Sequence, residues 1–373
     1  MSRPIIALLL TVSLAAAACS DANEESSPED GEQTTVSLDE LFDDLEGLTG
    51  DERRARLLQL ALEEDSDITL YTSLSVDDSG PLVDAFEDQY DIGTDLYRAS
   101  ASTVAQRLLL EADAGFAGAD VVMVNGTEMT VLDAEGLLAP FPSPVTDDLM
   151  PSVVFENWVG VYVQVFAAAW NTNFVDTSDA PETWEEVLTD YPGTLGMELG
   201  DFDWFATLIK DYFTTERGMS EDEAVALFSE AAKGALVVDG HTLMAEMLAG
   251  GTFDVASSPY QHRIQRLNGD GAPVAWEPAV EPLIARPNGV AIHRDTDSPA
   301  TALLLVEWIL TDAQQMFAMD FGRTPTNRLV EGGIPEGYEV LTVDLVALLE
   351  EREKWEGLYE SVVTQSGQAV GGD

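Results

Sequence analysis

The sequence predicts an α/β protein of two lobes, which hinge strands join and which enclose a ligand cleft. Short apolar runs alternate with helical stripes in two sets, over residues 68–124 and 194–256, and this alternation is typical of βαβ units. A longer, β-branched run at 159–171 lies between the sets, and another run follows at 287–293. If they pair, these two runs form a hinge over a cleft, which is a favoured place for ligands. One large sheet or two tandem domains are the alternatives.

The first residues predict an exported protein. Arg3 gives a cationic start, and the apolar run 5–18 rises only about 21 Å as a helix, too short to span a bilayer comfortably. We therefore expect a signal peptide over 1–18. Cys19, the one cysteine of the chain, follows small residues in a pattern that resembles a bacterial lipoprotein signal, in which this thiol is acylated after cleavage. A secreted protein with an incidental cysteine is the alternative.

Composition divides the rest of the chain. The residues after Cys19 are rich in like charges, so we expect a solvated acidic linker there. A leucine stripe then predicts a helix on the outside of the body. The predicted boundaries are 1–18 for the signal peptide, 19–50 for the linker, 51–66 for the peripheral helix, 67–165 plus 286–335 for the first lobe, 166–285 plus 336–365 for the second lobe, and 366–373 for a disordered tail.

Acidic residues dominate the charge. There are 69 Asp and Glu against 17 Lys and Arg, and the formal net charge is −52. Binding a polyanion requires a basic face, so this balance argues against nucleic acid as a partner. The 45% share of hydrophobic residues indicates a globular body. We expect a monomer without a cofactor.

Polar residues follow two predicted strands of the first lobe. Thr72, Ser73 and Ser75 come after the first strand, and Asn125 follows the run that ends at Val124. In an open α/β sheet, ligands lie beyond the carboxyl ends of the strands, where hydroxyl and amide groups can hold an anion or a polar ligand. We therefore expect these residues to bind the ligand. Capping of the following helices is the alternative for the hydroxyls.

Candidates in the second lobe come from three strand ends. Asp203 and Trp204 offer a carboxylate beside an aromatic plate, although a capped helix with a core tryptophan would show the same residues. His241 and Thr242 fall at the start of an amphipathic helix, where a histidine can also be mere surface decoration. Tyr260 could coordinate a metal, hydrogen-bond a ligand or only pack. We expect all five residues to bind the ligand.

Scarce arginines fall near the same loops. Arg98, Arg263, Arg286 and Arg323 lie in or beside them. Arginine suits a bidentate grip on carboxylate or phosphate groups, which favours an anionic ligand such as a phosphonate, a sugar phosphate or an organic acid. Pairing with the abundant acids of the chain is the alternative.

Nine stretches, taken in order, resemble the solute-binding proteins of bacterial ABC importers, in the iron(III)-type family of the type II periplasmic-binding class. The resemblance implies two α/β lobes that close over one small solute, which passes to a membrane permease driven by an ATPase. With Cys19 it implies a protein outside the cytoplasm, anchored to the cell membrane, on the periplasmic side where an outer membrane exists. The stretches are ITLYTSL (68–74), GADVVMVNG (118–126), LLAPFPSP (137–144), FAAAWNTNFV (166–175), APETWEEVL (180–188), VVDGHTLMAEMLAGG (237–251), PYQHRIQRL (259–267), ARPNGVAIH (285–293) and FGRTPTN (321–327).

The resemblance leaves the solute open between iron(III) and a small anion. The iron carriers of this class place two adjacent tyrosines at the segment aligned with 259–262, where this chain has only Tyr260. A ferric ion prefers anionic oxygen ligands, so losing one phenolate weakens the case for iron. Tyr260 is a metal ligand only if the solute is iron. A mixed oxygen and nitrogen site could still form from Tyr71, Tyr260, His241, His262 and Asp203.

The sequence carries none of the motifs G-x-S-x-G, H-E-x-x-H or G-x-x-x-x-G-K-[ST], so we do not expect an enzyme. A secreted hydrolase that uses two carboxylates is the enzymatic alternative, because the separation of carboxylates cannot be seen in a sequence. A two-lobed extracytoplasmic sensor or adhesion module is the other alternative, because one fold can serve several functions.

Overall fold

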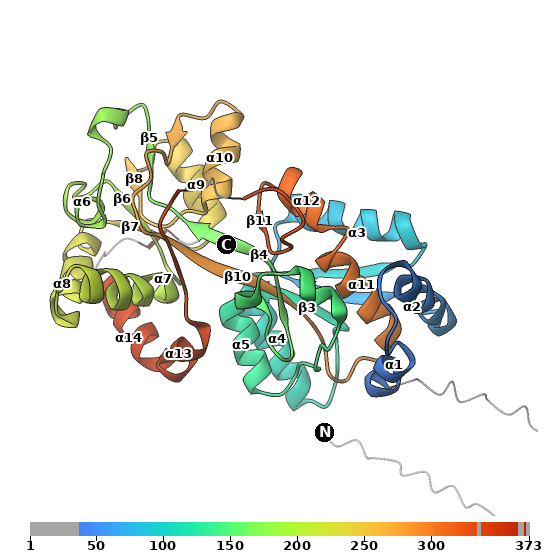
Figure 1. Cartoon of the computed structure of the whole chain (residues 1–373). Helices are drawn as coiled ribbons and strands as arrows, with labels where there is room; N and C mark the ends of the chain where they lie inside the picture. Colours follow the sequence, from blue (N-terminus) through green and yellow to red (C-terminus); the bar gives the residue numbers. More distant parts are fainter. Residues whose placement is uncertain (1–36, 334–336, 365–368, 371–373) are drawn as a thin grey trace, which may run out of the picture. The chain divides into compact units, whose positions relative to one another are not determined.

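The computed structural model describes residues 37–333, 337–364 and 369–370. Figure 1 shows their arrangement. The predicted signal peptide, Cys19 and most of the predicted linker lie outside the described residues. No described helix combines the length and apolar composition that crossing a membrane requires.

The first sheet, called sheet 1, has seven strands among the described residues, in the order β11-β4-β10-β3-β1-β2, with β12 paired to β10. β1 pairs in parallel with β2 and β3, whereas β10 runs antiparallel to β3 and β4. The strands are β1 (Ile68–Thr72), β2 (Thr94–Arg98), β3 (Val121–Asn125), β4 (Val159–Phe166), β10 (Leu283–Ile292), β11 (Thr324–Pro325) and β12 (Val340–Thr342).

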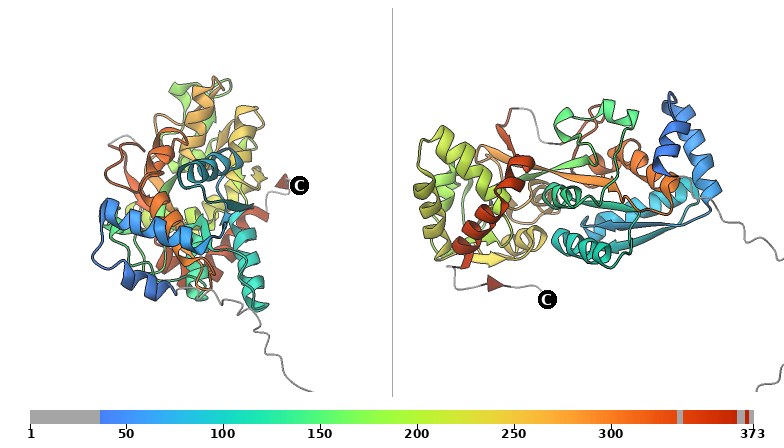
Figure 2. Two further views of the ribbon diagram at one scale, coloured as in Figure 1. Left: turned by 90° about the vertical axis from the view of Figure 1, so that its right-hand side faces the viewer. Right: turned by 90° about the horizontal axis from the view of Figure 1, so that it is seen from below.

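Helices cover both faces of sheet 1 (Figure 2). The continuous apolar run of β3 explains this, because successive side chains point to opposite faces and both must be buried. Val122 and Val124 pack with α4 and α5, whereas Val121 and Met123 pack with α3 and α11. The helices around this sheet are α1 (Leu38–Asp44), α2 (Gly50–Glu64), α3 (Val76–Tyr90), α4 (Ala101–Asp113), α5 (Gly126–Ala134), α11 (Pro299–Leu310) and α12 (Gln314–Met319), with short 3-10 helices at Pro144–Asp148 and Pro151–Val153.

The second sheet, called sheet 2, has six strands among the described residues, in the order β13-β7-β6-β8-β5-β9. Its strands are β5 (Ala169–Asn171), β6 (Leu195–Glu198), β7 (Leu236–Val238), β8 (Val255–Ala256), β9 (Val274–Ala275) and β13 (Ala369–Val370). Its helices are α6 (Trp184–Thr189), α7 (Phe202–Thr207), the π-helix η4 (Leu208–Glu216), α8 (Glu221–Ala232), α9 (His241–Ala249), α10 (Gln261–Gly269), α13 (Leu345–Glu350) and α14 (Arg352–Val363), with a 3-10 turn at Thr177–Asp179.

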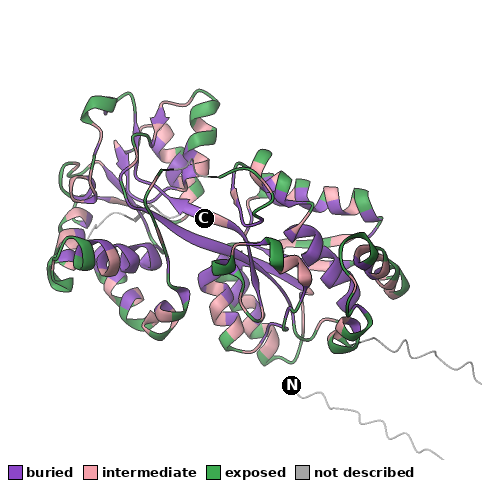
Figure 3. Ribbon diagram, in the orientation of Figure 1, coloured by how far each residue is buried: buried purple, intermediate pink, exposed green. Residues whose placement is uncertain are grey.

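Two long strands connect the sheets. β4 and β10 pair along nearly their whole length, and almost every residue in them is buried (Figure 3). After β4 the chain passes through Ala167 and Ala168 into β5 of sheet 2, and after β9 it returns to β10 of sheet 1. The predicted α/β class, with two lobes joined by hinge strands, is confirmed.

The two ends of the described chain differ from the sequence prediction. Residues 38–44, expected within the acidic linker, form α1, because Ser37 and Glu40 make a capping box and Leu41 is buried. At the other end, a disordered tail was expected over 366–373, but the backbone of Ala369–Val370 pairs in parallel with β7 at the edge of sheet 2.

Candidate functional site

A cavity of about 1380 Å³ opens at the strand ends of both sheets. It therefore lies where an α/β sheet is expected to hold a ligand. Sheet 1 contributes the ends of β1, β2 and β3 and the hinge strands, and sheet 2 contributes the loops after β6, β7 and β8. The lining includes Ser73, Ser75, Arg98, Ser102, Asn125, Thr127, Glu128, Gln164, Glu198, Asp201, Gly240, His241, Thr242, Tyr260, His262, Arg263, Arg286 and Arg323.

Several helices begin at the wall of this cavity, among them α3, α4 and α5 from sheet 1, and α9 and α10 from sheet 2. The first N–H groups of a helix have no partner within it and carry a partial positive charge. Ser100 caps α4 by accepting a hydrogen bond from the Thr103 N–H, whereas the N-cap residues of the other four helices make no side-chain capping bond. The cavity wall therefore has several backbone donors that suit an anion.

Six of the fourteen arginines line the cavity. Five of them form ion pairs: Arg263 with Glu246, Arg266 with Asp78, Arg286 with Asp203, Arg323 with Asp78, and Arg352 with Glu356. For these five, pairing with acids is what the structure shows.

Arg98 is the exception. Its Nε donates to the Leu74 carbonyl at 3.0 Å, and no carboxylate pairs with it among the described residues. Its guanidinium therefore keeps donors for a ligand.

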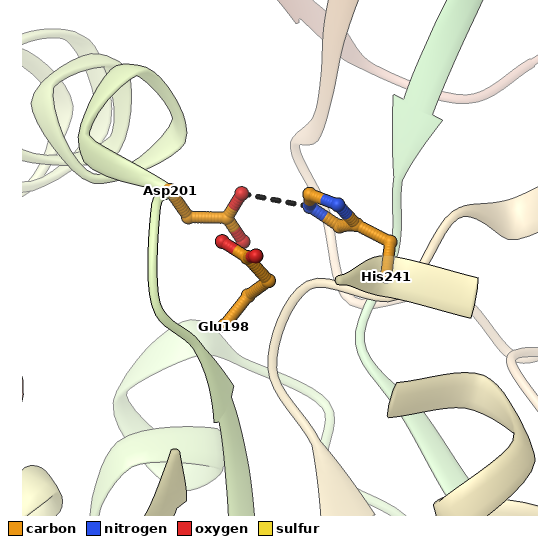
Figure 4. A group of neighbouring side chains, drawn as sticks. All are labelled: Glu198, Asp201 and His241. Atoms are coloured by element: carbon orange, nitrogen blue, oxygen red, sulfur yellow. Dashed lines mark hydrogen bonds and ion pairs between the residues drawn. The ribbon is translucent and has the colours of Figure 1, made fainter. Parts of the chain in front are cut away.

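Glu198, Asp201 and His241 form a compact group on the sheet 2 side of the cavity (Figure 4). The Nε2 of His241 lies 2.7 Å from Oδ1 of Asp201, and Ser258 donates to the other Asp201 oxygen. Glu198 accepts from the backbone N–H groups of Gly200 and Gly240. One ligand atom from each of the three residues lies within 4.8 Å of the others, so the group has the spacing of a metal site.

Burial and mutual repulsion set the charges of this group. Burial, followed by the charge of Asp201, raises the pKa of Glu198 to about 7. Burial by itself lowers the pKa of His241, but Asp201 and Glu198 outweigh it and raise this pKa above its ordinary value. Glu198 therefore titrates near neutral pH, and the two carboxylates favour the protonated form of His241.

Tyr260 lies between two histidine rings. Its ring stacks on His241 at 4.1 Å between centroids and on His262 at 5.6 Å. Its hydroxyl oxygen accepts a hydrogen bond from Nη2 of Arg286 at 3.1 Å. Burial raises the pKa of Tyr260 and holds the pKa of His262 well below its ordinary value. Both side chains are therefore neutral at pH 7.

A buried ion pair joins the two sheets at the base of the cavity. Asp203, on α7, pairs with Arg286 of hinge strand β10, and Thr127 of α5 donates to the same carboxylate at 2.9 Å. Burial by itself raises the pKa of Asp203, but the charge of Arg286 and the hydrogen bonds from Arg286, Thr127 and the Trp204 N–H together outweigh burial and lower this pKa. Asp203 is fully buried and acts on the cavity by holding Arg286.

Most of the residues predicted from the sequence come together. Ser73, Ser75, Asn125, His241, Thr242 and Tyr260 all line the cavity.

Thr72, Asp203 and Trp204 do not line it. Thr72 is buried and bonds the Met123 carbonyl and the Leu74 N–H, and Trp204 packs edge-on against Trp184 in the core of sheet 2.

Tyr71 also lies away from the cavity, because its hydroxyl bonds Glu111. The mixed metal site that would include Tyr71 is therefore not assembled, although His241, Tyr260 and His262 are adjacent.

Sequence reasoning missed several lining residues. Glu198 ends β6 and could have been found as a strand-end residue. Gln164 and Glu128 gave no such signal, because the first is on a hinge strand and the second is within a helix. Arg352 reaches the cavity from the helix α14, which only the tertiary structure places there.

The family model for bacterial extracellular solute-binding proteins matches residues 81–332 of this chain. AfuA from Actinobacillus pleuropneumoniae, solved with exogenous fructose-6-phosphate bound, is 19% identical with a TM-score of 0.68, covering 80% of this chain and 99% of that chain. Iron-bound HitA from Pseudomonas aeruginosa is 16% identical with a TM-score of 0.64, at 80% and 99% coverage. The ferric binding protein from Campylobacter jejuni is 16% identical with a TM-score of 0.67, at 79% and 99% coverage.

No curated protein sequence matches this chain. At these identities, the likeness to the solved structures shows a shared two-lobed fold.

Proposed function

The chain belongs to the bacterial extracellular solute-binding proteins, and from this premise we propose that it captures a small anion in its cavity and delivers it to an ABC permease with its ATPase. The anion would be a phosphonate, a sugar phosphate or an organic acid. A protein of this family acts outside the cytoplasm and binds its solute without converting it.

The convergence of several helix N-termini on one cavity carries the proposal. Each N-terminus contributes partial positive charge and unpaired N–H groups, and the N-cap residues of α3, α5, α9 and α10 make no side-chain capping bond. An anion is the ligand that satisfies several such donors together. The fructose-6-phosphate bound to AfuA, which shares the fold, is compatible with this class of solute.

Arg98 adds a charged donor to these backbone groups. It is the cavity arginine without a carboxylate partner among the described residues, and it ends β2 beside the start of α4. Hydrogen bonds to charged groups contribute about 1.5–3 kcal/mol. Losing Arg98 should therefore weaken anion binding by roughly tenfold to a hundredfold.

Calorimetric titration of the mature protein tests the proposal. Fructose 6-phosphate, methylphosphonate, inorganic phosphate and citrate are the probes, and we expect at least one to bind. Arg98→Ala should weaken that binding, whereas Arg294→Ala should not, because Arg294 is exposed and outside the cavity lining. If none of the four anions binds the wild type, the proposal fails.

Ferric iron is a second candidate solute, which the group of Glu198, Asp201 and His241 beside Tyr260 favours. The raised pKa of Tyr260 opposes it, because iron binding would require the phenolate. Ferric citrate added to the wild type should then produce a visible phenolate-to-iron absorption band, which Tyr260→Phe removes. Absence of the band in the wild type excludes a tyrosine-bound ferric ion.

We also propose that lipid on Cys19 anchors the protein to the cell membrane and that the protein acts as a monomer. The support is the sequence pattern around Cys19. Wild-type protein should then sediment with membranes, and Cys19→Ala should release the protein or leave it with an uncleaved signal. Sedimentation of a cleaved Cys19→Ala protein with membranes, as for the wild type, would contradict the anchor.

A further inference from the structure

We propose that Glu128 and Arg286 hold a hydroxyl group of the solute at the base of the cavity, so that the solute is a hydroxylated anion such as a sugar phosphate or a hydroxy acid. This inference rests on the proposed anionic solute and narrows its class. It predicts that an anion without a hydroxyl group binds more weakly than one of similar size that has it.

Arg286 keeps its Nε–H for the solute. It lines the cavity with only 5% of its surface exposed. Its Nη1 donates to Asp203, and its Nη2 donates to Gln164 and Tyr260, each at 3.1 Å. Its Nε is buried without a partner among the described residues. Because Asp203 already balances the charge of Arg286, this Nε–H suits a neutral oxygen better than a second full anion.

Glu128 supplies an acceptor beside this donor. It lines the cavity from the first turn of α5, directly after Thr127, whose hydroxyl shares Asp203 with Arg286. Its Oε2 is buried without a hydrogen-bond partner among the described residues. Among the described residues, no ion pair joins Glu128 and Arg286 directly.

A hydroxyl group matches this arrangement. An unpaired buried donor and an unpaired buried acceptor are both unfavourable, and one hydroxyl can satisfy both because it accepts and donates. Oxygens of an ionised phosphate, phosphonate or carboxylate only accept, and an ammonium group only donates. The anionic end of the solute remains for the helix N-termini and Arg98.

Paired titrations test this inference on the mature protein. Fructose 6-phosphate and hexyl phosphate share the phosphate group, but only the first has hydroxyl groups. We expect the wild type to bind fructose 6-phosphate at least about tenfold more tightly than hexyl phosphate. Glu128→Met should shrink this ratio severalfold by weakening only the sugar phosphate, and Glu128→Gln should shrink it less.

Glu111→Met is the matched control. The Oε2 of Glu111 is also buried without a partner, but Glu111 does not line this cavity. The control should keep the wild-type ratio, and thermal unfolding should show that each variant is folded.

The outcomes separate the two proposals. If the wild type binds neither phosphate, the sugar phosphate class and this inference both fail. If it binds both equally, or if Glu128→Met and Glu128→Gln keep the full ratio, the anionic solute stands and the hydroxyl position is wrong. An equal loss of the ratio in Glu111→Met also overturns it.

Discussion

Asp203 shows how one buried carboxylate can serve a site that it does not line. It orients Arg286 and is bonded by Thr127, so it connects a hinge strand with helices from both sheets. Arg286 is almost fully buried, and its charge has no other carboxylate partner among the described residues. Removing one partner of a buried ion pair leaves an uncompensated charge, which is strongly destabilising.

We predict that Asp203→Asn lowers the free energy of unfolding by about 3–5 kcal/mol at pH 7, as measured by denaturant titration. Adding Arg286→Met should restore much of the loss, because the unpaired charge is then gone. The pKa of Asp203 is lowered in the folded state, so its stabilisation is present above its unfolded pKa and is lost as the pH falls through the folded pKa. The difference between wild type and Asp203→Asn should therefore shrink in acid. An equal difference at all pH values would contradict this account.

Among the helices, α2 supplies the N-terminal cap of α11. All twelve residues of α11 are buried, and the side chain of its N-cap residue makes no capping hydrogen bond. Glu64, at the end of α2, accepts hydrogen bonds from the N–H groups of Ala300 and Thr301 at 2.7 and 2.8 Å. Near the other end, Arg53 forms a buried ion pair with Glu307. The helix α2, which was predicted to lie on the outside of the body, is therefore held by these bonds against the buried helix α11 of sheet 1.

We predict that Glu64→Ala lowers the free energy of unfolding by about 0.5–2 kcal/mol, which is the usual cost of losing an N-cap. Glu63→Ala is the control, because Glu63 is exposed and bonds only Gln59 among the described residues. Its effect should stay within about 0.5 kcal/mol. Thermal unfolding measures both, and equal effects would mean that Glu64 does not cap α11.

Across the whole molecule, residues from both sheets line the cavity, so we expect a bound solute to couple the two sheets. A solute that bridges them stabilises both sheets, since it binds only the folded state.

We predict that a solute at about one hundred times its Kd stabilises the protein by about 2.7 kcal/mol and raises the midpoint of a single thermal transition. Calorimetry on the mature protein checks this. If solute shifts only the first of two separate transitions, binding involves one sheet alone and the cavity does not couple them.

Local patterns account for most of the predicted fold. Alternating apolar runs and helical stripes identified the parallel strands and their helices, because each pattern must bury a defined face. The rule that ligands bind beyond strand ends also selected Ser73, Asn125 and Tyr260, which line the cavity. It misplaced Trp204, because a tryptophan after a strand end can equally turn into the core, and sequence spacing does not fix that direction.

The sequence by itself determined the fold class, the hinge strands and the loops that surround the cavity, because these follow from periodicity and from the ends of strands. Only the tertiary structure decided which side chains meet there. Arg286 pairs with Asp203, which is far from it in the chain, and Arg98 has no carboxylate partner among the described residues. Such contacts depend on how two sheets pack across a hinge, and no local pattern encodes that packing.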